Sequence, residues 1–292
     1  MGAWSSFDEV LGRMQILTWN VQWCCGLDGV ADPARITRHA QGMGDIDVLC
    51  LQEVAVGHPA LAGGPGDQVA QIQALLPGWQ LFFAATTDGF DAQGQRRSFG
   101  NLVATRLAVA EVAQHRLPWL AEAGVVSMPR GCLVVTVRDP HLGLVRVMTT
   151  HLEYHSATQR MAQVRALQGI HAEALAQCGE PPGSAPAATP YTTPVHTPHA
   201  VLCGDFNMGP LDAEYAALVA PGAAPLHNSW QVLQGDAPQP ATFCVFDRTW
   251  GPAPVACDFA LVSDSLRSHV QGWRSDGATQ LSDHQPVLLT LA

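Results

Sequence analysis

The stretch His199-Ala200-Val201-Leu202-Cys203-Gly204-Asp205-Phe206-Asn207 is an apolar run that stops at a glycine and then presents two polar side chains. It has the composition of a buried strand that ends in a loop. Because side chains alternate along an extended chain, Asp205 and Asn207 are expected to point the same way, with Phe206 in the core. Gly-Asp is also ordinary turn chemistry. The stretch alone therefore leaves open a simple turn or two polar groups that converge on one ligand.

Polar side chains occupy similar places in other parts of the chain, at or beside apolar, strand-like runs. Glu53 follows such a run, and a carboxylate there must be paired, metal-bound or neutral unless it reaches solvent. His151 taken singly is compatible with a structural, hydrogen-bonded imidazole. Asp258 interrupts an apolar strand and is expected to have a specific partner. The full group is Asn20, Glu53, His151, Asp205, Asn207, Asp258, Asp283 and His284.

The donor atoms of this group favour one kind of metal. Carboxylate oxygens suit Mg²⁺, or Mn²⁺ in its place, and the cysteines are not spaced as a zinc site. The two histidines can bind a transition metal or contact phosphate. The sequence has no G-x-S-x-G elbow, no Walker loop and no dinucleotide-binding glycine motif, which argues against a serine hydrolase and against those nucleotide-binding classes.

Composition sets further limits. The 292 residues are 47% hydrophobic, enough for a substantial core, and the formal net charge is -10. All 15 basic residues are arginine. This balance argues against broad, nonspecific affinity for nucleic acid, which depends on many cationic phosphate contacts. Several of the eight cysteines lie in apolar runs, so we expect reduced thiols and a cytoplasmic location.

Strands and helices are mixed without the strict alternation of a doubly wound sheet. Several apolar runs have the composition of strands buried on both faces, which predicts an α/β (α+β) four-layer sandwich of two packed mixed β-sheets flanked by helices. Helices are expected over 33–43, 67–76, 156–176 and 212–219. Besides the quoted stretch, strands are expected over 14–21, 48–51, 79–86, 99–106, 131–138, 144–150, 255–262 and 287–291.

Residues 14–292 are expected to form a single domain, preceded by an N-terminal extension over 1–13, with translation starting at Met1 or Met14. The extension lacks the charge and apolar pattern of a signal peptide or a membrane span. A Pro-rich loop insertion is predicted over 178–198, because prolines alternate there with small and hydroxylated residues.

Six short segments, in this order along the chain, resemble the endonuclease/exonuclease/phosphatase superfamily, the fold shared by deoxyribonuclease I, exonuclease III, neutral sphingomyelinases and inositol-polyphosphate 5-phosphatases. Any one of these segments is a weak signal, but six in order make a chance turn at Asp205 improbable. The segments are Thr18-Trp19-Asn20-Val21, Leu51-Gln52-Glu53-Val54, Thr150-His151-Leu152, Gly204-Asp205-Phe206-Asn207, Cys257-Asp258-Phe259 and Ser282-Asp283-His284.

The resemblance implies a divalent-metal-dependent phosphoesterase that hydrolyses a phosphodiester or phosphomonoester by direct attack of an activated water. It implies Mg²⁺, or Mn²⁺, as the cofactor. Glu53 would be the principal metal ligand, with Asn20 and Asp283 beside it. Hydrolysis of a phosphoester needs such a cation, an aligned water and donors around the phosphorus.

The other positions receive roles by the same resemblance. Asp205 would orient or deprotonate the water, and Asn207 would hold a phosphate oxygen. Asp258 would fix the tautomer of His284, since a carboxylate behind a histidine is the usual way to orient an imidazole. His284 and His151 would contact the scissile phosphate.

The substrate is less well defined than the chemistry. Abasic endonucleases of the superfamily usually carry tyrosine at the position of His151, so the sequence is closer to the deoxyribonuclease, sphingomyelinase and phosphatase branches, and it looks like bacterial members. Further substrate contacts are expected from Arg97, Asn101 and Arg160, each with a surface or structural role as the alternative. The expected partner is a phosphate ester, with nucleic acid, a small molecule and a phospholipid headgroup all left open, and no protein partner is evident. A nuclease and a noncatalytic binding module on the same fold remain the alternatives.

Overall fold

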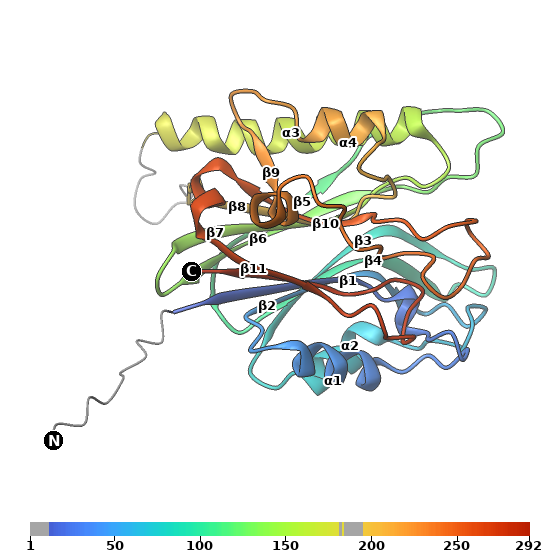
Figure 1. The fold of residues 1–292 in the computed structure, drawn as a ribbon. Helices are drawn as coiled ribbons and strands as arrows, with labels where there is room; N and C mark the ends of the chain where they lie inside the picture. The colour runs from blue at the N-terminus through green and yellow to red at the C-terminus, as the bar shows by residue number, and fades with distance from the viewer. Residues whose placement is uncertain (1–11, 181–182, 184–194) are drawn as a thin grey trace, which may run out of the picture.

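The computed structural model describes residues 12–180, 183 and 195–292. Two six-stranded mixed sheets pack face to face (Figure 1). The first sheet contains, from edge to edge, β11 (Val270–Ser275), β12 (Val287–Leu291), β1 (Met14–Asn20), β2 (Val48–Val56), β4 (Arg96–Thr105) and β3 (Gln80–Phe90). The second contains β5 (Ala108–Arg116), β6 (Gly131–Asp139), β7 (Gly143–His151), β8 (Ala200–Asp205), β10 (Asp258–Ser263) and β9 (Leu226–Asn228).

Helices form the two outer layers, which completes the predicted four-layer sandwich (Figure 1). The first sheet is covered by α1 (Pro33–Met43) and α2 (Gln68–Leu75), and the second by α3 (Ala157–Gly179) and α4 (Ala213–Leu218). Shorter helices are η1 (Gln22–Cys24), α5 (Ser229–Gln234) and η2 (Asp264–His269). None of the helices in the described residues has both the length and the apolar character that a membrane crossing requires.

The period-two pattern of the strands divides the core into layers. In β7, Val145 and Val147 pack between the sheets, whereas Met148 packs toward α3. In β1, Ile16 belongs to the layer between the sheets and Leu17 belongs to the layer under α1 and α2. Side chains of a strand thus alternate between two apolar layers, as expected for strands buried on both faces.

Local sequence signals locate several elements correctly. Helix α1 spans the predicted 33–43, and the Asp32 side chain accepts a hydrogen bond from the backbone N–H of Ala34 at 2.8 Å. Ser156 caps α3 by accepting from the backbone N–H of Gln159. The last strand, β12, also spans the predicted 287–291. Side-chain caps satisfy helix amides that have no intrahelical partner. A capping residue such as Asp or Ser therefore marks the start of a helix in a sequence.

Other elements differ from the prediction. Strands β5, β9 and β11 and the short helix α5 were not expected from the sequence. The expected strands over 79–86 and 99–106 are also longer than predicted, because β3 and β4 stay paired through the polar segment as far as Phe90 and Arg96. These pieces have weak apolar patterns, and pairing to a neighbouring strand stabilises them, a long-range effect.

Two predicted boundary segments fall largely outside the described residues. Of the N-terminal extension over 1–13, residues 1–11 lie outside them. Of the Pro-rich insertion over 178–198, residues 181–182 and 184–194 lie outside them, and helix α3 continues through Cys178 to Gly179. The eight cysteines are free thiols, and all except Cys178 are buried.

Candidate active site

The polar strand ends meet in one cavity of about 260 Å³. Strands β1 and β2 are parallel in the first sheet, and β7 and β8 are parallel in the second. Their carboxyl ends lie at the same end of the sandwich, since Glu53 of β2 and His151 and Asp205 of β7 and β8 line one cavity, and Asn20 of β1 contacts Asp205. The predicted residues that line the cavity are Glu53, His151, Asp205, Asn207, Asp283 and His284. The other two, Asn20 and Asp258, are buried beside it and contact these side chains.

Asp205 lies at the centre of the site. One of its oxygens, Oδ2, accepts a hydrogen bond from Asn20 Nδ2 at 2.9 Å. The same oxygen is 3.4 Å from His151 Nε2 and 3.6 Å from His284 Nε2. The other oxygen, Oδ1, accepts from the backbone N–H of Asn207 at 2.9 Å. Burial opposes the charged form, but the neighbouring imidazoles and these hydrogen bonds hold the Asp205 pKa below its ordinary value.

Gly204 allows β7 and β8 to approach closely at this point. Its φ is +138°, a conformation that side-chain-bearing residues rarely adopt, and a Cβ added here would lie 2.0 Å from the carbonyl oxygen of Thr150. Thr150 pairs with Gly204, and the next pair in register is His151 with Asp205. The glycine therefore brings the imidazole and the carboxylate side by side.

Glu53 reaches the cavity through an irregularity in β2. Gln52 points toward the second sheet, where its Nε2 donates to Thr149 Oγ1 at 2.9 Å. Regular alternation would turn Glu53 to the opposite face. Instead, the β2–β4 register shifts between Leu51 and Val54, and Glu53 has a φ of +62°. A bulge of this kind re-aims a side chain, and here Glu53 Oε1 accepts from Asn20 Nδ2 at 3.0 Å.

His284 forms a buried pair with Asp258. The imidazole Nδ1 is 2.9 Å from Asp258 Oδ2, which leaves Nε2 facing Asp205. Burial opposes a charged imidazole, but the carboxylates of Asp258 and Asp205 outweigh it and raise the His284 pKa well above its ordinary value. Phe243 stacks on the ring, with centroids 4.4 Å apart. The ring is therefore fixed in orientation and held as the imidazolium.

His151 has the opposite protonation state. Burial, followed by the repulsion of Arg130, lowers the His151 pKa to about 3. Its ring lies between two carboxylates, with Nε2 near Asp205 and Nδ1 3.9 Å from Glu53 Oε1. The site therefore combines one neutral and one charged imidazole on either side of Asp205, a separation of protonation states typical of acid–base sites.

Arg130 lines the cavity and was not among the residues expected from the sequence. Its guanidinium is buried, and Nε is 3.6 Å from Glu153 Oε2. Nε and one terminal nitrogen have no hydrogen-bond partner in the described residues. The residue immediately precedes β6, which runs antiparallel to β7, so it lies beside the end of β7 where His151 is. Once β6 is known to pair antiparallel with β7, a basic residue just before β6 is expected to lie beside His151, and this is the signal that could have identified Arg130.

The carboxylates of the cavity fit a divalent cation. Glu53 and Asp283 both line it, and burial together with the charge of Asp283 raises the Glu53 pKa to about 7. Gln22 Nε2 donates to Asp283 Oδ2 at 3.0 Å. Burial and the charge of Asp205 raise the pKa of Asp283 as well, and crowded carboxylates of this kind are the donor set that a hard cation would stabilise. Asn20 as a metal ligand stays a prediction, because its Oδ1 accepts from the backbone N–H of Gln22.

A second group with ligand-like spacing is less suited to a metal. Single atoms of Asp205, Cys257 and His284 lie within 4.8 Å of one another. Burial and neighbouring carboxylates raise the Cys257 pKa well above its ordinary value, so this thiol is protonated. A thiol is a poor ligand for a hard cation, and metals bind the thiolate. We therefore assign the cation to the side of Glu53 and Asp283.

The three predicted substrate contacts lie outside the residues that line the cavity. Arg97 pairs with Asp91 at 2.9 Å, near the turn between β3 and β4. Asn101 donates to the carbonyl oxygen of Gly131 at 3.2 Å, and so holds the strand next to Arg130. Arg160 pairs with Glu214 at 2.9 Å and donates to the carbonyl oxygen of Glu153. In this structure Asn101 and Arg160 bind backbone carbonyl groups next to the cavity-lining residues Arg130 and Tyr154.

Comparison with known proteins identifies the fold. A family model described as Endonuclease/Exonuclease/phosphatase family matches residues 17–284. No curated protein matches the chain in sequence. An endonuclease/exonuclease/phosphatase from Beutenbergia cavernae has a TM-score of 0.70 at 22% identity, covering 96% of this chain and 71% of the other.

Two further solved structures have the same fold. A mannosyl-6-phosphatase from Bacteroides thetaiotaomicron has a TM-score of 0.69 at 19% identity, covering 96% of this chain and 99% of the other. The human Nocturnin catalytic domain with a bound sulfate has a TM-score of 0.61 at 17% identity, covering 96% and 93%. The chain belongs to the Endonuclease/Exonuclease/phosphatase family, and with it to the hydrolases that act on phosphate ester bonds.

Proposed function

We propose that the protein is a divalent-metal-dependent phosphoesterase in which Asp205 activates the attacking water. One observation carries the proposal: a single buried carboxylate oxygen, Asp205 Oδ2, faces Asn20, His151 and His284 at 2.9, 3.4 and 3.6 Å. Asp205 accepts a proton from the water, and the imidazolium of His284 stabilises negative charge on the phosphate. Asp258 keeps His284 protonated and oriented, as a carboxylate behind a catalytic histidine does.

The remaining side chains position the substrate and the cation. Glu53 and Asp283 would hold Mg²⁺, or Mn²⁺ in its place, and the cation would withdraw charge from a phosphate oxygen. Asn20 donates to both Glu53 and Asp205, so it fixes the distance between the metal side and the water side of the site. Asn207 and Arg130 line the cavity and supply donors for the remaining phosphate oxygens.

We favour a small phosphate ester over a nucleic acid as the substrate. Among the described residues, Arg130 is the only arginine that lines the cavity, whereas aromatic side chains line it at Trp23, Phe99, Tyr154 and Trp250. Binding along a nucleic acid backbone depends on several cationic phosphate contacts. An aromatic wall beside one phosphate site suits a ring-bearing or apolar leaving group. A cytoplasmic location, suggested by the free thiols, is part of the proposal.

The test is turnover of a substrate panel by purified protein with Mg²⁺ or Mn²⁺. The panel contains p-nitrophenyl phosphate, bis-p-nitrophenyl phosphate, single- and double-stranded DNA, RNA, phosphoinositides and sphingomyelin. We expect metal-dependent turnover of a small ester. Turnover of nucleic acid in preference to every small ester would make the protein a nuclease. Absence of turnover and of metal binding would leave a noncatalytic binding module.

Glu53→Gln is expected to weaken Mn²⁺ binding by at least ~100-fold, because it removes a carboxylate ligand and keeps the shape of the side chain. Isothermal titration calorimetry with Mn²⁺ measures the affinity. Glu180→Gln is the matched control, since Glu180 is exposed at the end of α3. Equal affinity in the two variants and in the unaltered protein would place the cation elsewhere.

Arg130→Met is expected to lower kcat by roughly 100-fold, because it removes a preorganised cation beside the phosphate position. The same change leaves the fully buried Glu153 without its partner and should lower the free energy of unfolding. The double variant Arg130→Met/Glu153→Gln separates the two effects. We expect it to recover stability but not kcat. Recovery of kcat together with stability would assign Arg130 a structural role only.

A further inference from the structure

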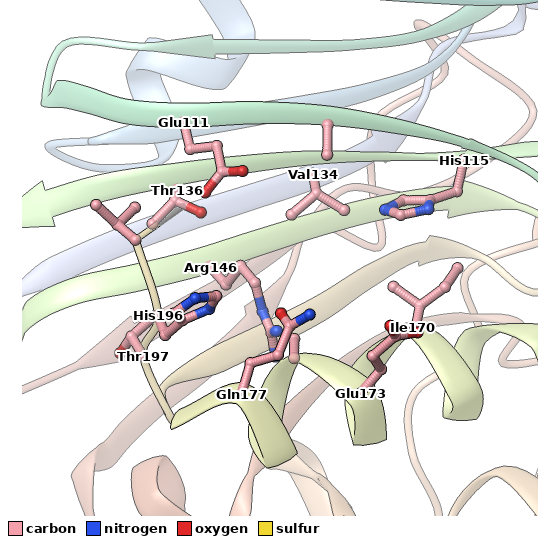
Figure 2. A pocket seen from close by; sticks show the side chains of 13 residues that line it. Glu111, His115, Val134, Thr136, Arg146, Ile170, Glu173, Gln177, His196 and Thr197 are labelled. Atoms are coloured by element: carbon pink, nitrogen blue, oxygen red, sulfur yellow. The ribbon is translucent and has the colours of Figure 1, made fainter. Parts of the chain in front are cut away.

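A second cavity, of about 300 Å³, lies on the opposite face of the second sheet, beneath helix α3. Figure 2 shows it between the strands, which carry Glu111, Thr136, His115 and Arg146, and the helix, which carries Glu173 and Gln177. None of the residues predicted for the catalytic site lines it. Its size is at the lower end of the range of ordinary small-ligand pockets.

Polar side chains replace the apolar pattern of the sheet at this cavity. On this face, Val134 of β6 and Met148 of β7 belong to the apolar layer under α3. The next positions on this face of the two strands are Thr136, two residues after Val134, and Arg146, two residues before Met148. Apolar side chains at these positions would continue the layer. Thr136 and Arg146 are neighbours in register, and Glu111 of β5 pairs with Thr136 on its other side. A polar row thus crosses three strands where a helix covers the sheet.

Arg146 is a buried cation whose positive charge has no anionic partner among the described residues. The residue is 8% exposed, and its only side-chain hydrogen bond within the described part of the chain joins a terminal guanidinium nitrogen to His171 Nδ1 at 2.8 Å. Nε is buried without a partner, and no described carboxylate lies within ion-pair distance of the guanidinium. Burial, reinforced by Arg146, lowers the His171 pKa to about 4, so His171 is neutral and supplies no counter-charge.

The other ionisable groups around the cavity leave the charge of Arg146 unpaired. Glu111 lies two strands away with Thr136 in between, which separates the backbones by about 10 Å. Glu173 is exposed on α3. Burial and the charge of Arg146 lower the His115 pKa, so this imidazole is neutral, and His196 also lines the cavity. A guanidinium that is buried with unused donors is costly unless an anion completes it.

We propose that this cavity binds a small oxyanion, a phosphate or a carboxylate group, with Arg146 as its charged partner. The guanidinium fork matches the paired oxygens of either group. His115, His196 and Gln177 surround the cavity with further hydrogen-bonding groups. The carboxylates of Glu111 and Glu173 limit the total negative charge that it accepts, which favours a ligand with a single anionic group.

The site is separate from the catalytic cavity. Arg146 and His151 lie on the same strand, five residues and about 17 Å apart, on opposite faces of the sheet. Val145 and Val147 fill the layer on the catalytic side. Binding at Arg146 is therefore independent of whether the proposed phosphoesterase activity is correct, and the two sites can be followed separately.

The test uses the full chain labelled with ¹⁵N-histidine, whose ring resonances report both cavities. Sodium phosphate and, in a second arm, sodium acetate are titrated at constant ionic strength against sodium chloride. We expect saturable shifts of the His115 and His196 resonances with at least one of the two anions. Variants His115→Gln and His196→Gln assign the signals, while His151 and His284 report the catalytic cavity.

Arg146→Met is expected to abolish the shifts of His115 and His196 and to leave the response of His151 and His284 unchanged. Arg138→Met is the matched control, because Arg138 is exposed on the neighbouring strand β6. Shifts that persist in Arg146→Met overturn the proposal. So does a titration of the unaltered protein in which neither phosphate nor acetate moves these resonances more than chloride does, and that result does not depend on whether a variant folds.

Discussion

Asp205→Asn is expected to lower kcat by about 1,000-fold, within the range for loss of a general base. The substitution keeps the size of the side chain and its hydrogen bond from the backbone N–H of Asn207, but an amide cannot accept the proton of water. It also removes one of the two carboxylates that keep His284 charged. We therefore expect the His284 pKa to fall, although Asp258 still holds it above its ordinary value.

Steady-state kinetics with the substrate identified from the panel measure this effect, and far-ultraviolet circular dichroism checks the fold. Asp236→Asn is the matched control, because Asp236 is exposed after α5. We expect it to keep the kcat of the unaltered protein. A kcat for Asp205→Asn within a few-fold of the control would contradict the proposed water activation and would point to metal-bound or substrate groups as the base.

Gly204→Ala is expected to lower the free energy of unfolding by at least ~3 kcal/mol. The added Cβ would lie 2.0 Å from the carbonyl oxygen of Thr150, a backbone atom that cannot rotate away, and φ is +138°. Relief requires separation of β7 from β8, which also separates His151 from Asp205. Stability and kcat should therefore fall together. Urea denaturation measures the stability change from the midpoint at constant slope.

Gly169→Ala provides the control for this prediction, since it is the same chemical change in a different backbone setting. Gly169 lies inside helix α3, and nothing lies within 4 Å of an added Cβ. Alanine is favoured over glycine in a helix, so we expect a gain of up to ~1 kcal/mol. Similar effects at the two positions would mean that the close approach of β7 and β8 is not a constraint.

The strand-end residues were predictable because their signal is local. Asp205 and Asn207 follow an apolar run at a spacing of two, and the structure brings them into one cavity with Glu53 and His151. The side-chain direction of Glu53 was not predictable in the same way. It depends on a bulge between β2 and β4, and the position of a bulge is set by pairing across the sheet.

Arg130 was missed for a topological reason. The polar residues with a sequence signal follow apolar runs, whereas Arg130 precedes one and reaches the site because β6 runs antiparallel to β7. Arg97 stays a prediction as a substrate contact, and its pairing with Asp91 across the turn has no local signal in the sequence. Both cases require knowledge of which strands are neighbours, and single-sequence patterns do not contain it.

The arrangement of the first sheet also has a consequence for how the protein is made. The first strand, β1, lies between β2 and β12, and Asp283 and His284 come just before β12. Until the segment that carries Asp283, His284 and β12 has been synthesised, β1 has one open edge and the candidate active-site cavity lacks one of its walls. Pairing two strands that are far apart in the sequence is slow because loop closure must precede it. From the synthesis of β1 until that of β12, the nascent chain therefore exposes a strand edge, the state in which chaperone binding and aggregation compete.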